Sequence, residues 1–289
     1  MIIVRIWEGL GNQLFQYAYA WSLQQRMNVP VYLDVGHHNR GDFPFEKEDI
    51  VKRKLQIQHF NISLKRIDIK KIPALTCLKN KNVIDKIGYL LLKSNFYKWR
   101  VIDDNEIMLD ICADIMVPDD YTYMNVHCIN KGYYKDCRDA LLQELQLKKE
   151  LKLSENLRTI LADRNTVSLH IRLTDYLTNP RVLCRQRYYD KAIQYIKDNI
   201  CNPYFIIFTD DITMAKAKYK FSENVYWISE DSYADYEELI IMSKCQHNIM
   251  AQSTFSYWGA WLNQNEEKIV VAPQQWVGRG LYEKGWKVL

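Results

Sequence analysis

Short β-branched runs alternate with amphipathic helical stretches along this chain, and this alternation limits its fold more than any other feature. Residues 2–7 (IIVRIW) have the composition of a strand in a buried parallel sheet. Glycines follow at positions 9 and 11, a helical pattern covers about 12–27, and 31–34 (VYLD) has the pattern of a second strand. This order predicts one βαβ unit at the start of the chain.

The second half of the chain continues the alternation. Strands are predicted at 166–172, 204–208, 225–228, 247–251 and 269–272, and helices at 188–199, 212–219, 233–244 and 255–263. Strands that alternate with helices indicate a parallel, doubly wound sheet. A charged helix expected near 141–153 marks the boundary between two α/β lobes, 1–150 and 151–289, and ligands would bind in the cleft between them. The mixed pattern of 36–130 predicts no clear elements.

Charge is unevenly distributed along the chain. The formal net charge of +4 is too small to indicate a nucleic-acid-binding protein. Residues 47–100, however, hold 14 Lys and Arg against 4 Asp and Glu. We therefore expect a basic insertion in the N-terminal lobe, suited to anionic lipid headgroups or phosphorylated substrates. A solvated, variable insertion would explain the same charge.

The cysteine pattern and the apolar runs indicate the cellular compartment in which the protein is expected. The seven cysteines are odd in number and include no C-x-x-C pair, so we expect reduced thiols. No signal peptide is visible at the start, and the longest apolar run, near 87–92, is far too short to span a membrane. The expected location is the cytoplasm, with at most a peripheral contact with the inner face of the membrane through 47–100.

A first candidate site is the turn EGLGNQ at 8–13, between the first strand and the first helix. Glycines there allow a ligand to approach the backbone, and the free N–H groups of a helix start attract an anion. Leu14 stands where a dinucleotide-binding motif would have its third glycine. An ordinary tight turn explains the pattern equally well.

A second candidate site is HIRLTD at 170–175, at the end of a predicted strand. Strand alternation places His170 and Arg172 on the same face, and Asp175 follows in the loop. A guanidinium can hold a phosphate through two parallel hydrogen bonds, which would suit a phosphorylated ligand. The alternative is a structural Arg–Asp pair beside a histidine whose hydrogen bonds are satisfied within the protein.

Two further candidates lie where later strands meet helices. Asp210 and Asp211 could accept hydrogen bonds from a ribose or a guanine, or could simply cap the next helix. Ser253 and Thr254 begin a helix and offer donors for a phosphate, although helix capping explains them as well. We expect the tryptophans at 258 and 261 to be core residues in either case.

Several chemistries lack their usual motifs. No Asp-x-Asp pair and no pair of histidines at i, i+4 is present, so we expect no metal site. The G-x-S-x-G elbow of hydrolases and the P-loop are also missing from the sequence. A nucleotide site here would have to neutralise phosphate with arginine and helix starts.

Four motifs together resemble the α-1,2-fucosyltransferases of glycosyltransferase family eleven. They are GLGNQLFQYA at 9–18, HIRLTD at 170–175, FTDD at 208–211 and STFSYWGAWLN at 253–263. The resemblance implies a GT-B-like fold with two Rossmann-type lobes, of which the C-terminal one binds the donor and the N-terminal one the acceptor. It also implies GDP-β-L-fucose as donor, the 2-hydroxyl of a terminal galactose as acceptor, no metal cofactor, and a bacterial role in surface polysaccharide or O-antigen synthesis.

The same resemblance implies roles for single residues. Arg172 would stabilise the departing diphosphate, and Asp175 or Glu8 would be the base. The implied donor-binding residues are His170, Arg172, Asp210, Asp211, Ser253, Thr254, Phe255, Gly11 and Asn12.

Three positions depart from the usual family pattern. Leu173 replaces the second arginine of H-x-R-R-x-D, Glu8 replaces the first glycine of the turn, and Gln252 replaces an asparagine. A transferase for another sugar nucleotide, a GDP-sugar-binding protein without turnover, and a membrane-docking module built on 47–100 are the competing hypotheses.

Overall fold

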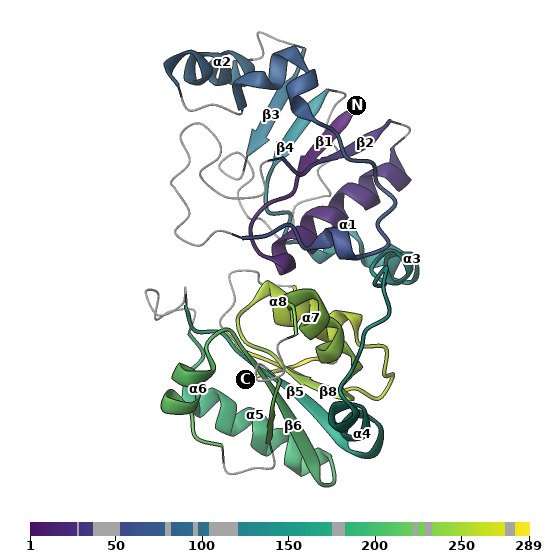
Figure 1. Ribbon diagram of the computed structural model, residues 1–289, viewed down its shortest axis with the longest axis vertical. Coiled ribbons are helices and arrows are strands. Elements are labelled where there is room, and N and C mark those ends of the chain that lie inside the picture. Colours follow the sequence, from purple (N-terminus) through teal and green to yellow (C-terminus); the bar gives the residue numbers. More distant parts are fainter. Residues whose placement is uncertain are drawn as a thin grey trace. The chain divides into compact units, whose positions relative to one another are not determined.

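The chain forms two compact units, Met1–Lys148 and Lys149–Leu289, beside the boundary expected between 150 and 151 (Figure 1). The computed structural model describes residues 1–27, 29–36, 53–78, 82–94, 98–103, 121–174, 183–221, 225–228, 233–274 and 281–289. Each unit contains its own parallel sheet with helices, so the prediction of two α/β lobes is confirmed. Their assignment to acceptor and donor, and the cleft between them, stay predictions.

The N-terminal unit is built on a four-stranded parallel sheet in the order β2-β1-β4-β3. The strands are β1 (Ile2–Arg5), β2 (Val31–Asp34), β3 (Arg100–Asp103) and β4 (Thr122–Asn125). Helix α1 (Leu10–Arg26) packs against β1 and β2, which completes the βαβ unit predicted at the start of the chain.

A second group of elements packs on the sheet of the N-terminal unit. Three 3-10 helices, η1 (Ile57–His59), η2 (Ile69–Lys71) and η3 (Pro73–Leu78), precede helix α2 (Val83–Lys93). Tyr89 and Leu92 of α2 join Ile3, Val101 and Tyr123 of the sheet in one hydrophobic core. The described part of the basic segment 47–100 is therefore folded onto the sheet through apolar side chains.

The C-terminal unit contains a six-stranded parallel sheet in the order β10-β9-β8-β5-β6-β7. Its strands are β5 (Asn165–Ile171), β6 (Pro203–Thr209), β7 (Val225–Trp227), β8 (His247–Ile249), β9 (Val270–Ala272) and β10 (Lys287–Val288). Its helices are α4 (Glu155–Asp163), α5 (Gln186–Asn199), α6 (Ile212–Lys218), α7 (Asp235–Lys244) and α8 (Thr254–Leu262). Except for β10 and α4, all of these elements were predicted from the sequence.

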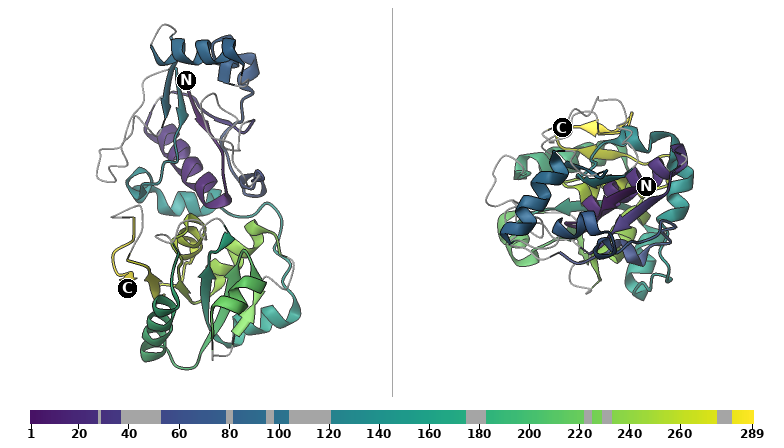
Figure 2. Two further views of the ribbon diagram at one scale, coloured as in Figure 1. Left: turned by 90° about the vertical axis from the view of Figure 1, so that its left-hand side faces the viewer. Right: turned by 90° about the horizontal axis from the view of Figure 1, so that it is seen from above.

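Helices cover both faces of this second sheet (Figures 1 and 2). Side chains of α5 and α6 share a core with Val167, Leu169 and Phe205, whereas side chains of α4 and α7 share another with Ile206 and Phe208. Buried residues of β6 alternate between these two apolar layers, which explains why this strand is a continuous hydrophobic run. In β5 the apolar residues all face the first core, and the buried polar residues Thr166, Ser168 and His170 alternate with them.

The prediction of one charged helix over 141–153 is wrong. Helix α3 (Arg138–Glu144) ends before this stretch is complete, and α4 begins only at Glu155. Residues 146–148 instead pair with 59–61, through backbone hydrogen bonds from Asn61 to Gln146 (2.8 Å) and from Lys148 to His59 (2.9 Å). Apolar residues at every second position, such as Leu145 and Leu147, favour this extended pairing over a helix.

Candidate functional site

The turn after β1 has an unusual backbone. Glu8 has φ of +64°, in the left-handed region that favours glycine. Gly9 then precedes the first helical residue, Leu10, and provides no side-chain cap for α1. The turn is fixed instead by Gln13, whose amide group donates to the carbonyl oxygens of Glu8 (2.7 Å) and Lys54 (2.9 Å).

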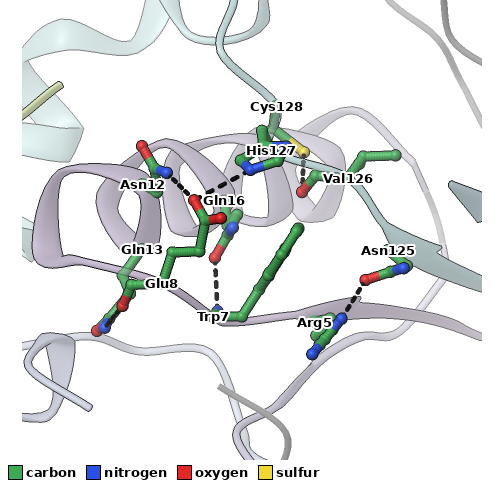
Figure 3. A network of polar contacts seen from close by, with 10 residues as sticks. All are labelled: Arg5, Trp7, Glu8, Asn12, Gln13, Gln16, Asn125, Val126, His127 and Cys128. Carbon is green, nitrogen blue, oxygen red and sulfur yellow. Dashed lines mark hydrogen bonds and ion pairs between the residues drawn. The ribbon is translucent and has the colours of Figure 1, made fainter. Parts of the chain in front are cut away.

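The Glu8 side chain meets two partners at the start of α1 (Figure 3). Its Oε2 atom accepts a hydrogen bond from the Asn12 side chain and lies 3.0 Å from Nε2 of His127. The Glu8 and His127 side chains are 17% and 20% exposed, which leaves both within reach of a ligand. Figure 3 shows the Glu8 carboxylate pointing along the first turn of α1 toward both partners.

Aromatic and cationic side chains pack on the His127 side of the cluster of Glu8, Asn12 and His127. The His127 ring packs on Trp7 at a centroid distance of 4.5 Å, and the Arg5 guanidinium lies 4.6 Å from the Trp7 ring centroid. Arg5 is fully buried and donates to Oδ1 of Asn125 at 2.7 Å. These contacts hold the His127 ring in one orientation, so the position of the Glu8 carboxylate is fixed before any ligand binds.

Two buried amide atoms of α1 have no hydrogen-bond partner among the described residues. They are Oδ1 of Asn12 and Nε2 of Gln16. Buried polar groups are nearly always paired in proteins, so unpaired ones near an accessible carboxylate point to a polar ligand. Gly11 lies in the same first turn of α1 and is buried. The cluster thus has the donors and acceptors that bind a sugar hydroxyl.

Sequence reasoning found Glu8, Gly11 and Asn12 but missed His127. The parallel register of β1 with β4, in which Val4 pairs with Met124, places the residues after both strands at the same edge of the sheet. Strand β4 lies inside the segment 36–130, where the sequence predicts no clear element. A prediction of β4 would have placed His127 beside Glu8.

In the C-terminal unit, Asp210 ties together the ends of two strands. Its carboxylate accepts from the backbone N–H groups of Leu173 (2.9 Å) and Thr174 (3.2 Å) and from the Thr174 hydroxyl (2.6 Å). Nη1 of Arg172 lies 3.1 Å from Oδ2 of the same carboxylate. Arg172 therefore has the acidic partner that the structural alternative requires, but the partner is Asp210. Asp175 lies outside the described residues.

Asp211 caps a helix. Its Oδ1 atom accepts from the backbone N–H of Met214 at 2.8 Å, which satisfies a donor at the start of α6. This is the alternative that the sequence left open for Asp211. The predicted contact of Asp210 or Asp211 with a nucleotide stays a prediction.

His170 is neutral at physiological pH. Burial lowers the pKa of His170 to about 3, and the nearby Arg172 guanidinium acts in the same direction against the opposing effect of Asp210. Nδ1 of His170 is buried without a hydrogen-bond partner among the described residues. A neutral imidazole carries one N–H, so His170 can bind a ligand as a dipole without adding charge.

The start of α8 lies beside His170. The ring of Phe255 packs on the His170 ring at 5.5 Å between centroids, which brings residues 253–255 to the end of β5. Ser253 caps α8 by accepting from the backbone N–H of Phe255 at 3.3 Å, and Thr254 is the first helical residue. The Arg172 guanidinium and the N–H groups of this helix start both offer hydrogen-bond donors at the ends of the strands, which suits an anion.

Trp258 and Trp261 are core residues, as predicted from the sequence. They are 0% and 3% exposed, respectively, and their rings contact each other edge to face at 5.0 Å.

In the described parts of the chain, no group of three or more His, Cys, Asp or Glu side chains is arranged to hold a metal ion. No helix in those parts is both long enough and apolar enough to cross a membrane. Metal independence therefore stays a prediction.

Comparison with known proteins places these features in context. Residues 1–284 match the model of Glycosyl transferase family 11. The chain is similar to the O-antigen biosynthesis glycosyltransferase WbnK of Escherichia coli, with 31% identity over 93% of this chain and 92% of that protein. It is also similar to an alpha-1,2-colitosyltransferase of Escherichia coli, with 26% identity over 96% and 93% of the two chains. The fucosyltransferase NodZ from Bradyrhizobium is a more distant structural neighbour, with a TM-score of 0.48 and 14% identity over 89% and 91%.

Because the pKa of His170 is lowered in the folded protein, we predict that this residue makes the folded state less stable at acid pH. Its folded-state pKa of about 3 lies below the ordinary value of about 6.5, so the unfolded state binds more protons at acid pH. The contribution of His170 to the free energy of unfolding does not change with pH above about pH 6.5. Below that pH it destabilises the folded state, by about 2 kcal/mol at pH 5. Urea unfolding near pH 7.5 and near pH 5 should show a smaller loss of stability for His170→Gln than for wild type. Equal losses in both proteins would contradict the assignment.

Proposed function

The chain belongs to glycosyl transferase family 11, and we propose that it transfers L-fucose from GDP-β-L-fucose to the 2-hydroxyl of a terminal galactose. Such a galactoside 2-alpha-L-fucosyltransferase would invert the anomeric centre and act in surface polysaccharide or O-antigen synthesis. One similar protein is named for O-antigen biosynthesis, which supports this setting. The other is named for colitosyl transfer with an alpha-1,2 linkage, which supports the linkage and makes another sugar nucleotide the second candidate donor.

The observation that carries the proposal is the group of anion-binding donors formed by the Arg172 guanidinium, the neutral His170 and the start of α8. Asp210 holds the Arg172 guanidinium at 3.1 Å, so a cation is already oriented at the ends of β5 and β6. A guanidinium has five N–H donors, so it can hold Asp210 and a phosphate oxygen at the same time. Fixed donors of this kind stabilise the charge that develops on a departing diphosphate.

In the proposed reaction, the acceptor oxygen attacks C1 of fucose from the face opposite GDP. The new C–O bond forms as the bond between C1 and the β-phosphate oxygen breaks, and GDP leaves with that electron pair. Arg172 and the N–H groups at the start of α8, around Ser253 and Phe255, bind the diphosphate. The proton of the acceptor hydroxyl passes to a carboxylate base.

Glu8 is the proposed base, with Asp175 as the alternative. The Glu8 carboxylate is fixed by Asn12 and by His127 at 3.0 Å, and a base must be held within hydrogen-bond reach of the proton it removes. In this proposal His127 is a positioning residue that keeps the carboxylate oriented. Gly11 and Asn12 would contact the sugar. No metal takes part in the proposed mechanism.

The proposed partners follow from this reaction. The protein would bind a GDP-sugar and a galactose-terminated oligosaccharide or lipid-linked glycan in the cytoplasm. A GDP-sugar-binding protein without turnover is the second class of function, and Leu173 in place of the usual second arginine is the feature that supports it.

A donor screen without added metal tests the proposal. Purified protein is mixed with GDP-fucose, GDP-mannose, UDP-galactose or UDP-glucose, each with lactose and with N-acetyllactosamine, in the presence of EDTA. We expect product mass and nucleotide release with GDP-fucose only. Transfer from another donor would replace the proposed specificity, and thermal protection by GDP without transfer to either acceptor would favour the binding protein. Activity lost in EDTA and restored by manganese would contradict a metal-free mechanism.

Replacing Arg172 should remove one of the donors that stabilise the departing diphosphate in the transition state. We expect Arg172→Ala to lower kcat by about 10²–10³-fold, the usual effect of removing one such donor. Arg158→Ala, at an exposed position of α4, is the matched control and should keep wild-type turnover. Near wild-type kcat in folded Arg172→Ala, judged by its melting temperature, would refute the role of Arg172.

Two variants of Glu8 separate its chemistry from its structure. Glu8→Gln keeps hydrogen-bonding atoms but cannot take a proton, so we expect kcat to fall by about 10²–10⁴-fold with KM little changed. Glu8→Gly restores the residue that suits a φ of +64° and should melt no lower than wild type, yet be equally inactive. Full activity of Glu8→Gly would show that Glu8 is not the base and would direct attention to Asp175.

A further inference from the structure

Large apolar side chains are exposed at one place in the N-terminal unit. Val83, Ile84, Ile87 and Leu90 of α2 are 72%, 78%, 54% and 57% exposed. Among the described residues, the other large hydrophobic side chain with comparable exposure is Val288, at 43%, on β10 of the C-terminal unit. Positions i, i+1, i+4 and i+7 lie on one side of a helix, so the four side chains of α2 form a continuous apolar surface.

Packing determines which side of α2 faces outward. Tyr89 and Leu92, on its opposite side, are buried in the core of the N-terminal unit. The Tyr89 hydroxyl and the Lys93 ammonium both bind Oδ2 of Asp103, each at 2.9 Å, which anchors α2 to β3. Asn82 caps the helix by accepting from the backbone N–H of Asp85 at 2.8 Å. The apolar surface is therefore presented by an anchored helix, and Figures 1 and 2 show α2 at one end of its unit.

Exposed basic side chains lie on α2 and on elements near it. Lys86 is exposed on α2 itself, and Lys70 and Lys71 are exposed on η2, which packs on η3, the neighbour of α2. Lys98 and Arg100 are exposed on the segment that follows α2 and leads into β3. Lysines beside an apolar helix face can extend their chains and place their ammonium groups at the level of lipid headgroups.

We propose that the exposed face of α2, together with these lysines, docks the N-terminal unit on an anionic lipid surface. Large apolar side chains would enter the boundary between headgroups and acyl chains, while Lys70, Lys71 and Lys86 bind lipid phosphates. Charge favours this occupant over a second copy of the chain. A symmetric contact through α2 would bring one basic surface against another, whereas an anionic membrane neutralises it. The proposal is independent of the donor and acceptor assigned above.

Sedimentation with lipid vesicles tests the docking surface. Full-length protein is mixed with phosphatidylcholine vesicles that contain or lack phosphatidylglycerol, at low and at high salt. We expect binding to the anionic vesicles that weakens as salt is added. Absence of binding, or equal and salt-independent binding to both kinds of vesicle, would overturn the proposal.

Variants assign the binding to α2. Ile84→Ser/Ile87→Ser should weaken partition at least about tenfold because apolar burial is lost, and Lys70→Gln/Lys71→Gln should weaken it about fivefold per charge. Val288→Ser, an exposed apolar position outside α2, is the matched control and should bind like wild type. All four substituted α2 and η2 side chains are exposed, so the melting temperatures should be unchanged. Wild-type binding by both double variants would overturn the proposal.

The same variants distinguish a self-association surface. Light scattering after size-exclusion chromatography should give the same mass, that of a monomer, for wild type and for Ile84→Ser/Ile87→Ser. A wild-type dimer that becomes a monomer in this variant would assign the apolar face of α2 to contact between copies of the chain and would overturn lipid docking.

Discussion

Parallel pairing of neighbouring strands is the constraint on which both candidate clusters depend. In the N-terminal unit the register of Val4 with Met124 places Glu8 and His127 at one edge, although 119 residues separate them. In the C-terminal unit β5 lies between β6 and β8, so the residues after all three strands also meet at one edge. In both units the polar residues that meet are far apart in sequence. The sheets are therefore the scaffold that creates these clusters, and the short loops after the strands supply the chemistry.

The sequence predicts this scaffold unevenly, for physical reasons. Strands β5 and β6 are each seven residues long. Strand β6 is an apolar run and β5 alternates apolar with polar residues, so their patterns identified both strands and the motifs that follow them. Strand β4 is four residues long (TYMN) and is stable as a strand because β1 and β3 pair with it on either side. No local pattern reports such tertiary support, so His127 was missed while Glu8 was found. For residues 141–153 the local sequence predicted a charged helix. Residues 146–148 instead form backbone hydrogen bonds with 59–61, a tertiary contact that the local sequence does not reveal.

The electrostatics of the C-terminal cluster combine two interpretations that the sequence presented as alternatives. Asp210 is a structural partner of Arg172, because the β5–β6 register pairs Ile171 with Thr209 and brings the next residues together. This structural pair also prepares the site for an anion, since a guanidinium that is already oriented needs little reorganisation when charge develops. Burial keeps His170 uncharged next to Arg172, which avoids placing a second cation in the same apolar surroundings. The missing second arginine at Leu173 leaves this edge with a single, well-fixed cation from the motif.

Backbone strain at Glu8 links the N-terminal cluster to function. A left-handed conformation costs a residue with a side chain roughly 1–2 kcal/mol compared with an ordinary conformation, and glycine avoids this cost. Such strain persists where surrounding contacts fix it, and it concentrates at functional sites. The Glu8 carboxylate joins Asn12 to His127, whose ring rests on Trp7 above the buried Arg5. A glycine at position 8 would relieve the strain but leave the Asn12 amide and the His127 ring without this carboxylate. The acidic residue, the amide and the imidazole thus form one interdependent unit, and the strained backbone is the structural cost of placing a carboxylate at a position whose conformation favours glycine.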